Sequence, residues 1–106
     1  MDDLHAKFLP QFLELARSRV AAALKAAGAR DHLAATTTAR NLHTLAGEAG
    51  LLGLHDVVPL ARDGEHKAKA FQVSRSDEDA ELLLAALRQL DRRIEQIGAA
   101  PGQGGS

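Results

Sequence analysis

The sequence predicts an all-α protein, an antiparallel up-and-down four-helix bundle. Aromatic residues make up only 3% of the 106 residues, with no Trp and no Tyr, whereas Ala and Leu are abundant. Sheet cores draw on β-branched and aromatic residues, while Ala and Leu favour helices. Apolar residues also recur every three or four positions in four successive stretches with short connections. These observations together favour four packed helices.

The first helix is expected from about Asp3 to Ala27. Pro10 disfavours a helical conformation at the residue before it, so a short extra N-terminal helix is expected, with Pro10 in the first turn of the main helix. Gly28 is the expected stop. The residues that share the inward face are Leu9, Phe12, Leu13, Ala16, Val20, Ala23, Leu24 and Ala27.

The second helix is expected from about Arg30 to Leu52. Asp31 is a suitable N-cap, because its carboxylate can accept hydrogen bonds from the first free backbone N–H groups. Gly53 is expected to end the helix. The inward-facing residues are Thr38, Leu42, Leu45, Ala49 and Leu52.

The third helix is expected to start after Asp56 as N-cap, with Pro59 in its first turn, where a missing N–H costs little. Gly64 lies on the inward side and weakens the helix by about 1 kcal/mol relative to Ala. A glycine at this position allows a neighbouring helix to approach closely. The other inward-facing residues are Val57, Leu60, Ala61, Ala68 and Phe71.

The fourth helix has the clearest pattern. Ser76 can cap it, and three acidic residues follow in the first turn, where the helix dipole favours negative charge. Gly98 is the expected stop, so we expect a bundle domain over residues 1–98 and a disordered tail or linker over residues 99–106. The inward-facing residues are Leu83, Leu87, Leu90, Ile94 and Ile97.

Composition excludes several classes of function. The net charge is −1, with 13 basic and 14 acidic residues, so we expect no nucleic-acid or anionic-membrane partner. The sequence has no cysteine, no apolar run long enough to span a membrane and no positively charged signal start, which predicts a cytoplasmic protein. The five histidines form no i, i+4 pair, so no metal site is expected.

His43 is expected to project outward from the middle of the second helix. At ~100° per residue, it lies about 100° to 160° around the helix axis from its core neighbours Leu42 and Leu45. Small neighbours leave the ring reachable by a concave partner, although an exposed histidine is often only a solvated side chain. The neighbours on the same face are Ala39, Arg40, Ala46, Gly47 and Gly50.

The segment from His43 to Gly53, HTLAGEAGLLG, resembles the signature of histidine-containing phosphotransfer (HPt) domains. These include the phosphorylatable N-terminal domain of chemotaxis-type histidine kinases. The family pattern is H-x-L-K-G, then five residues, then G. The resemblance implies that His43 accepts a phosphoryl group and passes it to or from an aspartate of a response-regulator receiver domain.

The resemblance also implies roles for residues around His43. Gly47 matches the glycine that leaves room for the phosphoryl group, and Glu65 falls where a glutamate hydrogen-bonds the other ring nitrogen, unless it is only a solvated charge. Ala46 replaces the lysine that neutralises phosphoryl charge in the family. Arg40 or Arg62 can supply that cation instead, or the domain has lost transfer.

Two functions remain open from the sequence. One is a phosphocarrier with no turnover of its own and no bound cofactor, whose partners are a receiver domain that brings Mg²⁺ and a histidine-kinase core, in the same parent chain or separate. The other is a non-catalytic interaction module. A free-standing hydrolase is disfavoured, because no serine–histidine–acid arrangement or phosphate-cradling loop is visible. The expected docking surface comprises Ala39, Ala46, Gly50 and Leu51.

Overall fold

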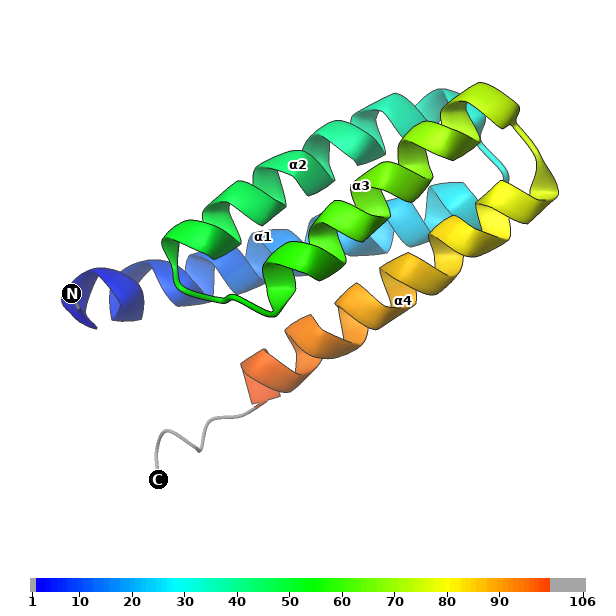
Figure 1. Ribbon diagram of the computed structural model, residues 1–106. Coiled ribbons are helices and arrows are strands. Elements are labelled where there is room, and N and C mark those ends of the chain that lie inside the picture. The colour runs from blue at the N-terminus through cyan, green and yellow to red at the C-terminus, as the bar shows by residue number, and fades with distance from the viewer. Residues whose placement is uncertain (1, 100–106) are drawn as a thin grey trace.

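The computed structural model describes the backbone of residues 2–99 and the side chains of residues 5–99. Four antiparallel helices form an elongated bundle (Figure 1), which confirms the predicted fold class. The helices are α1 (Asp2–Gly28), α2 (Ala35–Leu51), α3 (Val57–Ser74) and α4 (Asp77–Ala99), and a short 3-10 helix, η1 (His32–Ala34), precedes α2. Each α-helix packs against the next along the chain, and α4 packs back against α1, so the four form a closed ring.

The first helix differs from the prediction. A separate short helix before Pro10 was expected, but α1 is continuous from Asp2 to Gly28, with Pro10 inside it. Both Pro10 and Ala6 are exposed. Water can therefore hydrogen-bond the Ala6 carbonyl, which loses its helical N–H partner at Pro10, and the helix continues. The predicted stop at Gly28 is confirmed.

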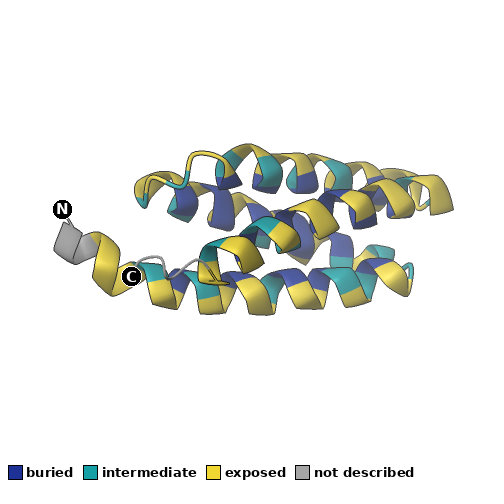
Figure 2. Ribbon diagram, turned by 90° about the horizontal axis from the view of Figure 1, so that it is seen from below, coloured by how far each residue is buried: buried dark blue, intermediate teal, exposed yellow. Residues whose placement is uncertain are grey.

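The core lies along the axis of the bundle, where the buried faces of all four helices meet (Figure 2). The predicted inward stripes are confirmed, since their members are buried or pack partly buried against the core. Spacing of three and four residues places such side chains on one helical face. The largest fully buried side chains are Phe71, Leu42, Leu45, Leu83, Leu87, Leu90, Ile94, Val20 and Val57.

The close approach predicted at Gly64 is present between α3 and α2. A Cβ added to Gly64 would lie 3.0 Å from Cδ1 of Leu42 and 3.9 Å from Cδ2 of Leu87. Because a methyl group has little room there, glycine sets the separation of the two helices at this level. This contact fixes α3 against α2 next to the helical turn that carries His43.

Two of the predicted caps differ in detail. Asp31 accepts hydrogen bonds from the backbone N–H groups of Leu33 and Ala34 at 3.1 and 3.2 Å, so it caps η1, which leads into α2. Asp56 makes no side-chain cap, contrary to the prediction, because its own backbone is already helical. Its carboxylate instead forms an ion pair with Nε of Arg93 on α4 at 2.6 Å.

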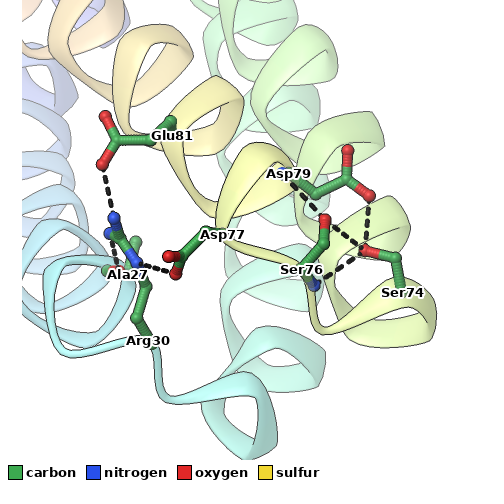
Figure 3. A network of polar contacts seen from close by, with 7 residues as sticks. All are labelled: Ala27, Arg30, Ser74, Ser76, Asp77, Asp79 and Glu81. Atoms are coloured by element: carbon green, nitrogen blue, oxygen red, sulfur yellow. Dashed lines mark hydrogen bonds and ion pairs between the residues drawn. The ribbon is translucent and has the colours of Figure 1, made fainter.

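Polar contacts stabilise the end of the bundle where α1 leads into η1 and α3 leads into α4 (Figure 3). Arg30 takes a left-handed conformation (φ 58°), and its guanidinium donates hydrogen bonds to the carboxylates of Asp77 and Glu81 on α4. Hydrogen bonds from Arg30 to Glu81 and Asp77 raise its pKa further above the usual range. Ser76 accepts a hydrogen bond from the backbone N–H of Asp79 at 3.1 Å, so the predicted cap of α4 is confirmed.

The last helix ends one residue later than predicted. It continues through Gly98 to Ala99, and the rest of the expected tail, residues 100–106, lies outside the described residues. Within the described residues, no helix is both long enough and apolar enough to cross a membrane.

Candidate functional site

His43 lies in the middle of α2 and points away from the core. Its side chain is 78% exposed, whereas Leu42 and Leu45 on the same helical turn are buried. The predicted outward orientation is therefore what the helix geometry produces. The fold contributes a fixed backbone position for the ring and leaves the ring itself in solvent.

Glu65 on α3 lies directly beside the His43 ring. Its carboxylate oxygens are 3.3 Å (Oε1) and 3.2 Å (Oε2) from Nδ1 of His43, and its side chain is only 15% exposed. Because a carboxylate accepts hydrogen bonds, this contact assigns the ring hydrogen to Nδ1. In the neutral ring the lone pair is then on Nε2, on the far side from the carboxylate.

Lys69 completes a polar cluster of three residues. Its Nζ lies 3.1 Å from Oε2 of Glu65, one helical turn along α3. Partial burial raises the pKa of Glu65, but hydrogen bonds and charge interactions with Lys69 and His43 outweigh this effect and leave the pKa below its usual value. Glu65 is therefore a carboxylate at neutral pH, held between a lysine and an imidazole.

These residues border a shallow pocket of about 350 Å³ between α2 and α3. His43 and Arg40 contribute from α2, and Glu65 and Lys69 contribute from α3. Sequence reasoning missed Lys69 as a site residue, although its spacing of four from Glu65 was a usable signal. It also missed two polar residues, because the relative register of α2 and α3 brings them to the pocket: Thr36 and Gln72.

The two arginines expected to supply a cation lie in different places. Arg40 is exposed and lines the pocket beside His43. Arg62 is exposed on α3 but does not line this pocket. Arg62 precedes Glu65 by three residues on α3 and Lys69 follows it by four, so the two basic residues lie one turn to either side of Glu65 along the helix.

Gly47 is exposed one turn after His43. A Cβ added to Gly47 would meet no heavy atom within 4 Å. Packing within the described residues therefore does not require glycine here, although glycine destabilises a helix interior by roughly 0.5–1 kcal/mol relative to alanine. This distinguishes Gly47 from Gly64, whose neighbours leave little room for a side chain.

Two of the four residues of the predicted docking surface are largely buried. Ala39 and Ala46 are only 5% and 4% exposed, although Ala39 lines the pocket beside His43. Gly50 is exposed, with Val58 of α3 at ordinary contact distance from an added Cβ. Leu51 is 90% exposed but borders a second, largely apolar hollow formed by α1 and the end of α2.

Among the side chains of residues 5–99, no group of three or more His, Cys, Asp or Glu residues is placed to hold a metal ion. The cluster of His43, Glu65 and Lys69 brings an imidazole, a carboxylate and an ammonium group together from two helices. This arrangement is suited to orienting a nucleophilic imidazole.

The four-helix bundle places an exposed imidazole beside a carboxylate on the neighbouring helix. The Hpt domain model matches residues 7–100, and the chain belongs to that family. The searches of curated proteins and of solved structures each gave no match. Hpt domains act in histidine phosphotransfer within phosphorelays and interact with receiver and kinase partners.

Proposed function

We propose that His43 accepts a phosphoryl group on Nε2 and exchanges it with an aspartate of a response-regulator receiver domain. The observation that carries this proposal is the contact between Glu65 and Nδ1 of His43 at 3.2 Å, on a ring that is 78% exposed. The carboxylate holds one nitrogen, and the other nitrogen faces solvent with its lone pair available for attack.

The transfer step follows from this geometry. The Nε2 lone pair attacks the phosphorus of an aspartyl phosphate, the N–P bond forms, and the O–P bond breaks so that the aspartate leaves as a carboxylate. Positive charge develops on the imidazole as the N–P bond forms. The Nδ1–H stays hydrogen-bonded to Glu65, whose negative charge stabilises the charged ring. The reverse transfer uses the same contacts in the opposite order.

The surrounding residues support this role in different ways. Gly47 leaves the space beside the ring open, and Arg40 brings a guanidinium to the pocket that can bind phosphoryl oxygens in a bidentate manner. The domain acts as a phosphocarrier without turnover of its own. The receiver supplies the Mg²⁺ and most of the catalytic groups, and a histidine-kinase core is the other expected partner.

The alternative is an interaction module that has lost phosphotransfer. The observation that favours it is Ala46, which stands where the family carries a lysine and is 4% exposed. This alternative predicts that a partner binds the folded domain equally well when His43 is replaced, and that no donor phosphorylates it.

Phosphorylation followed by intact-protein mass spectrometry tests the proposal. The protein is incubated with a phosphorylated receiver domain, with a kinase core and ATP, or with phosphoramidate as a chemical donor. The variants are His43→Gln and the matched control His66→Gln, which replaces another exposed histidine, on α3 next to Glu65.

The expected result is one acid-labile phosphoryl group on the wild type and on His66→Gln, and none on His43→Gln. His43→Gln is expected to unfold within ~0.5 kcal/mol of the wild type, because an exposed side chain contributes little to packing. Equal labelling of His43→Gln contradicts the assignment. A folded wild type that accepts no phosphoryl group from any donor favours the interaction module.

A further inference from the structure

We infer that Lys69 is the cation that faces the phosphoryl group on His43, in place of the lysine that the family carries at the position of Ala46. This inference rests on the proposed function, and it moves the positive charge from α2 to α3. Neither the resemblance to the family nor the sequence pattern indicated Lys69.

The site needs a cation because phosphorylation makes it strongly negative. A phosphoryl group carries nearly two negative charges at neutral pH. It would be held on a ring whose other nitrogen contacts the carboxylate of Glu65, which is itself ionised at that pH. The single positive charge of the phosphorylated ring does not balance the charges of the phosphoryl group and Glu65 together, so a further cation stabilises the site.

Lys69 is already held beside this ring. Oε2 of Glu65 is 3.1 Å from Nζ of Lys69 and 3.2 Å from Nδ1 of His43, so one carboxylate oxygen contacts both nitrogens. Lys69 also lines the same pocket as His43. Its ammonium group is therefore separated from the ring nitrogen by a single carboxylate oxygen, at the edge of the same pocket.

Lys69 is also able to change partners. Its side chain is 64% exposed and rotates about single bonds, and an ammonium group has three N–H donors. The ammonium group can therefore turn from Glu65 and bind a phosphoryl oxygen instead. The Nδ1–H of His43 keeps its hydrogen bond to Glu65 throughout, so binding of the phosphoryl oxygens leaves the tautomer unchanged.

Position 46, where the family carries its lysine, is much less exposed than position 69 in this protein. Ala46 is 4% exposed within the core cluster, so a longer side chain there would have to leave packed surroundings. Position 69 lies on the open side of α3. A cation at position 69 therefore requires no change in the packing around Ala46.

Other basic residues near the site fit less well. Lys67 forms an ion pair with Asp63 at 2.8 Å, and neither lines the pocket of His43. Arg62 is outside that pocket too. Arg40 lines it, but among the described residues no side-chain partner holds its guanidinium in place. Lys69 is thus the cation held by a direct contact to the residue that orients the ring.

The test compares Lys69→Met with Lys69→Arg and with the matched control Lys67→Met. Lys67→Met also removes one positive charge and one i, i+4 ion pair from α3, but away from the pocket. Each protein is phosphorylated with phosphoramidate, which releases ammonia as the N–P bond to His43 forms, and His43→Gln provides the background. Phosphorus NMR then follows the pKa of the phosphoryl group, a property that a purely structural role of Lys69 would not change.

Lys69→Met is expected to bind the phosphoryl proton about fivefold more tightly than the wild type, which is the effect of losing one unit charge at ~4 Å in water. The pKa of the phosphoryl group is thus raised in Lys69→Met, and this variant accepts the phosphoryl group more slowly than the wild type does. Lys69→Arg and Lys67→Met are expected to match the wild type. The difference should shrink at about 1 M salt, where the Debye length is ~3 Å.

The two proposals fail in different ways. If Lys69→Met is phosphorylated on His43 and titrates like Lys67→Met, Lys69 does not face the phosphoryl group, and the proposed function is unaffected. If Lys69→Arg fails to restore the wild-type titration, charge is not what Lys69 contributes, and the inference is also overturned. If wild-type His43 takes no phosphoryl group from any donor, both proposals are withdrawn.

Discussion

The inner and outer sides of α2 where it meets α3 differ in burial and polarity, although adjacent residues of the chain lie on them. Leu42 is 1% exposed and packs beside Gly64 of α3. The next residue, His43, is 78% exposed and contacts Glu65 of α3. The inner side holds the two helices together by apolar packing. The outer side places three polar groups at fixed positions. A substitution on one side should therefore leave the property of the other side largely intact.

The two glycines on these helices show the same difference. Gly64 has no room for a methyl group at normal contact distance, while Gly47 has no heavy atom near the position of its missing Cβ. One glycine is explained by the packing of the fold. The other is not, and it is one turn from the proposed phosphoacceptor.

The largest expected effect is on the inner side. Leu42→Ala should lower the free energy of unfolding by about 2–5 kcal/mol, because it removes buried methyl groups and leaves a cavity next to Gly64. The matched control is Leu51→Ala on the same helix, at a side chain that is 90% exposed, with an expected change within ~0.5 kcal/mol. Urea denaturation followed by circular dichroism measures both. Similar values for the two variants would contradict the assignment of the inner side.

A smaller loss is expected from Gly64→Ala. Alanine improves helix propensity, but its Cβ would lie 3.0 Å from Cδ1 of the buried Leu42. Overpacking of this kind should outweigh the gain and lower the free energy of unfolding by about 1 kcal/mol. Thermal and urea unfolding give the value. A variant more stable than the wild type would show that Leu42 moves aside freely.

The opposite sign is expected for Gly47→Ala. The fold should gain roughly 0.5–1 kcal/mol, because alanine favours the helix and meets no neighbour. Acceptance of a phosphoryl group from a receiver should nevertheless become slower, since the methyl group occupies space beside the ring of His43. Urea denaturation gives the free energy of unfolding, and intact-protein mass spectrometry of the same preparation follows the acceptance of the phosphoryl group. Faster or unchanged transfer would indicate that Gly47 does not serve the phosphoryl group.

The smallest effect concerns pH. The pKa of Glu65 is lower in the folded protein than in the unfolded chain, so its contacts with Lys69 and His43 add stability above the unfolded pKa. This contribution should be lost as the pH falls from the pKa of the unfolded chain through the lowered pKa of the folded protein. NMR of the Glu65 carboxyl group should show its pKa rising more in Lys69→Met than in His43→Gln. Equal pKa values in all three proteins would contradict the cluster.

Most of the fold follows from residue spacing, because a period near 3.6 residues encodes which face of a helix is buried. The failures have local causes. A helix break at Pro10 was predicted from the conformational preferences of proline and the residue before it. In the structure the helix continues, because water can hydrogen-bond the Ala6 carbonyl that loses its partner at Pro10. The cap at Asp56 was predicted from its residue type, yet Arg93 on α4 takes its carboxylate.

The site was predictable only in part, for a related reason. The outward direction of His43 follows from one helix, and the resemblance to the family indicated Glu65. Ala39 and Ala46 were expected to be exposed, but the width of the buried face of α2 depends on where α3 lies. The spacing of Lys69 from Glu65 was visible within one helix, whereas Thr36 and Gln72 reach the pocket only through the register between α2 and α3, which neither helix encodes alone.

The exposure of His43 has a consequence for timing. A phosphoramidate on an open ring is in contact with bulk water, so under the proposed function its lifetime is set by its own hydrolysis and by the arrival of the next acceptor. No part of residues 2–99 closes over it in this structure. The interval over which a signal persists then depends on the rate of hydrolysis and on the concentrations and affinities of the partners that visit the same exposed nitrogen in turn.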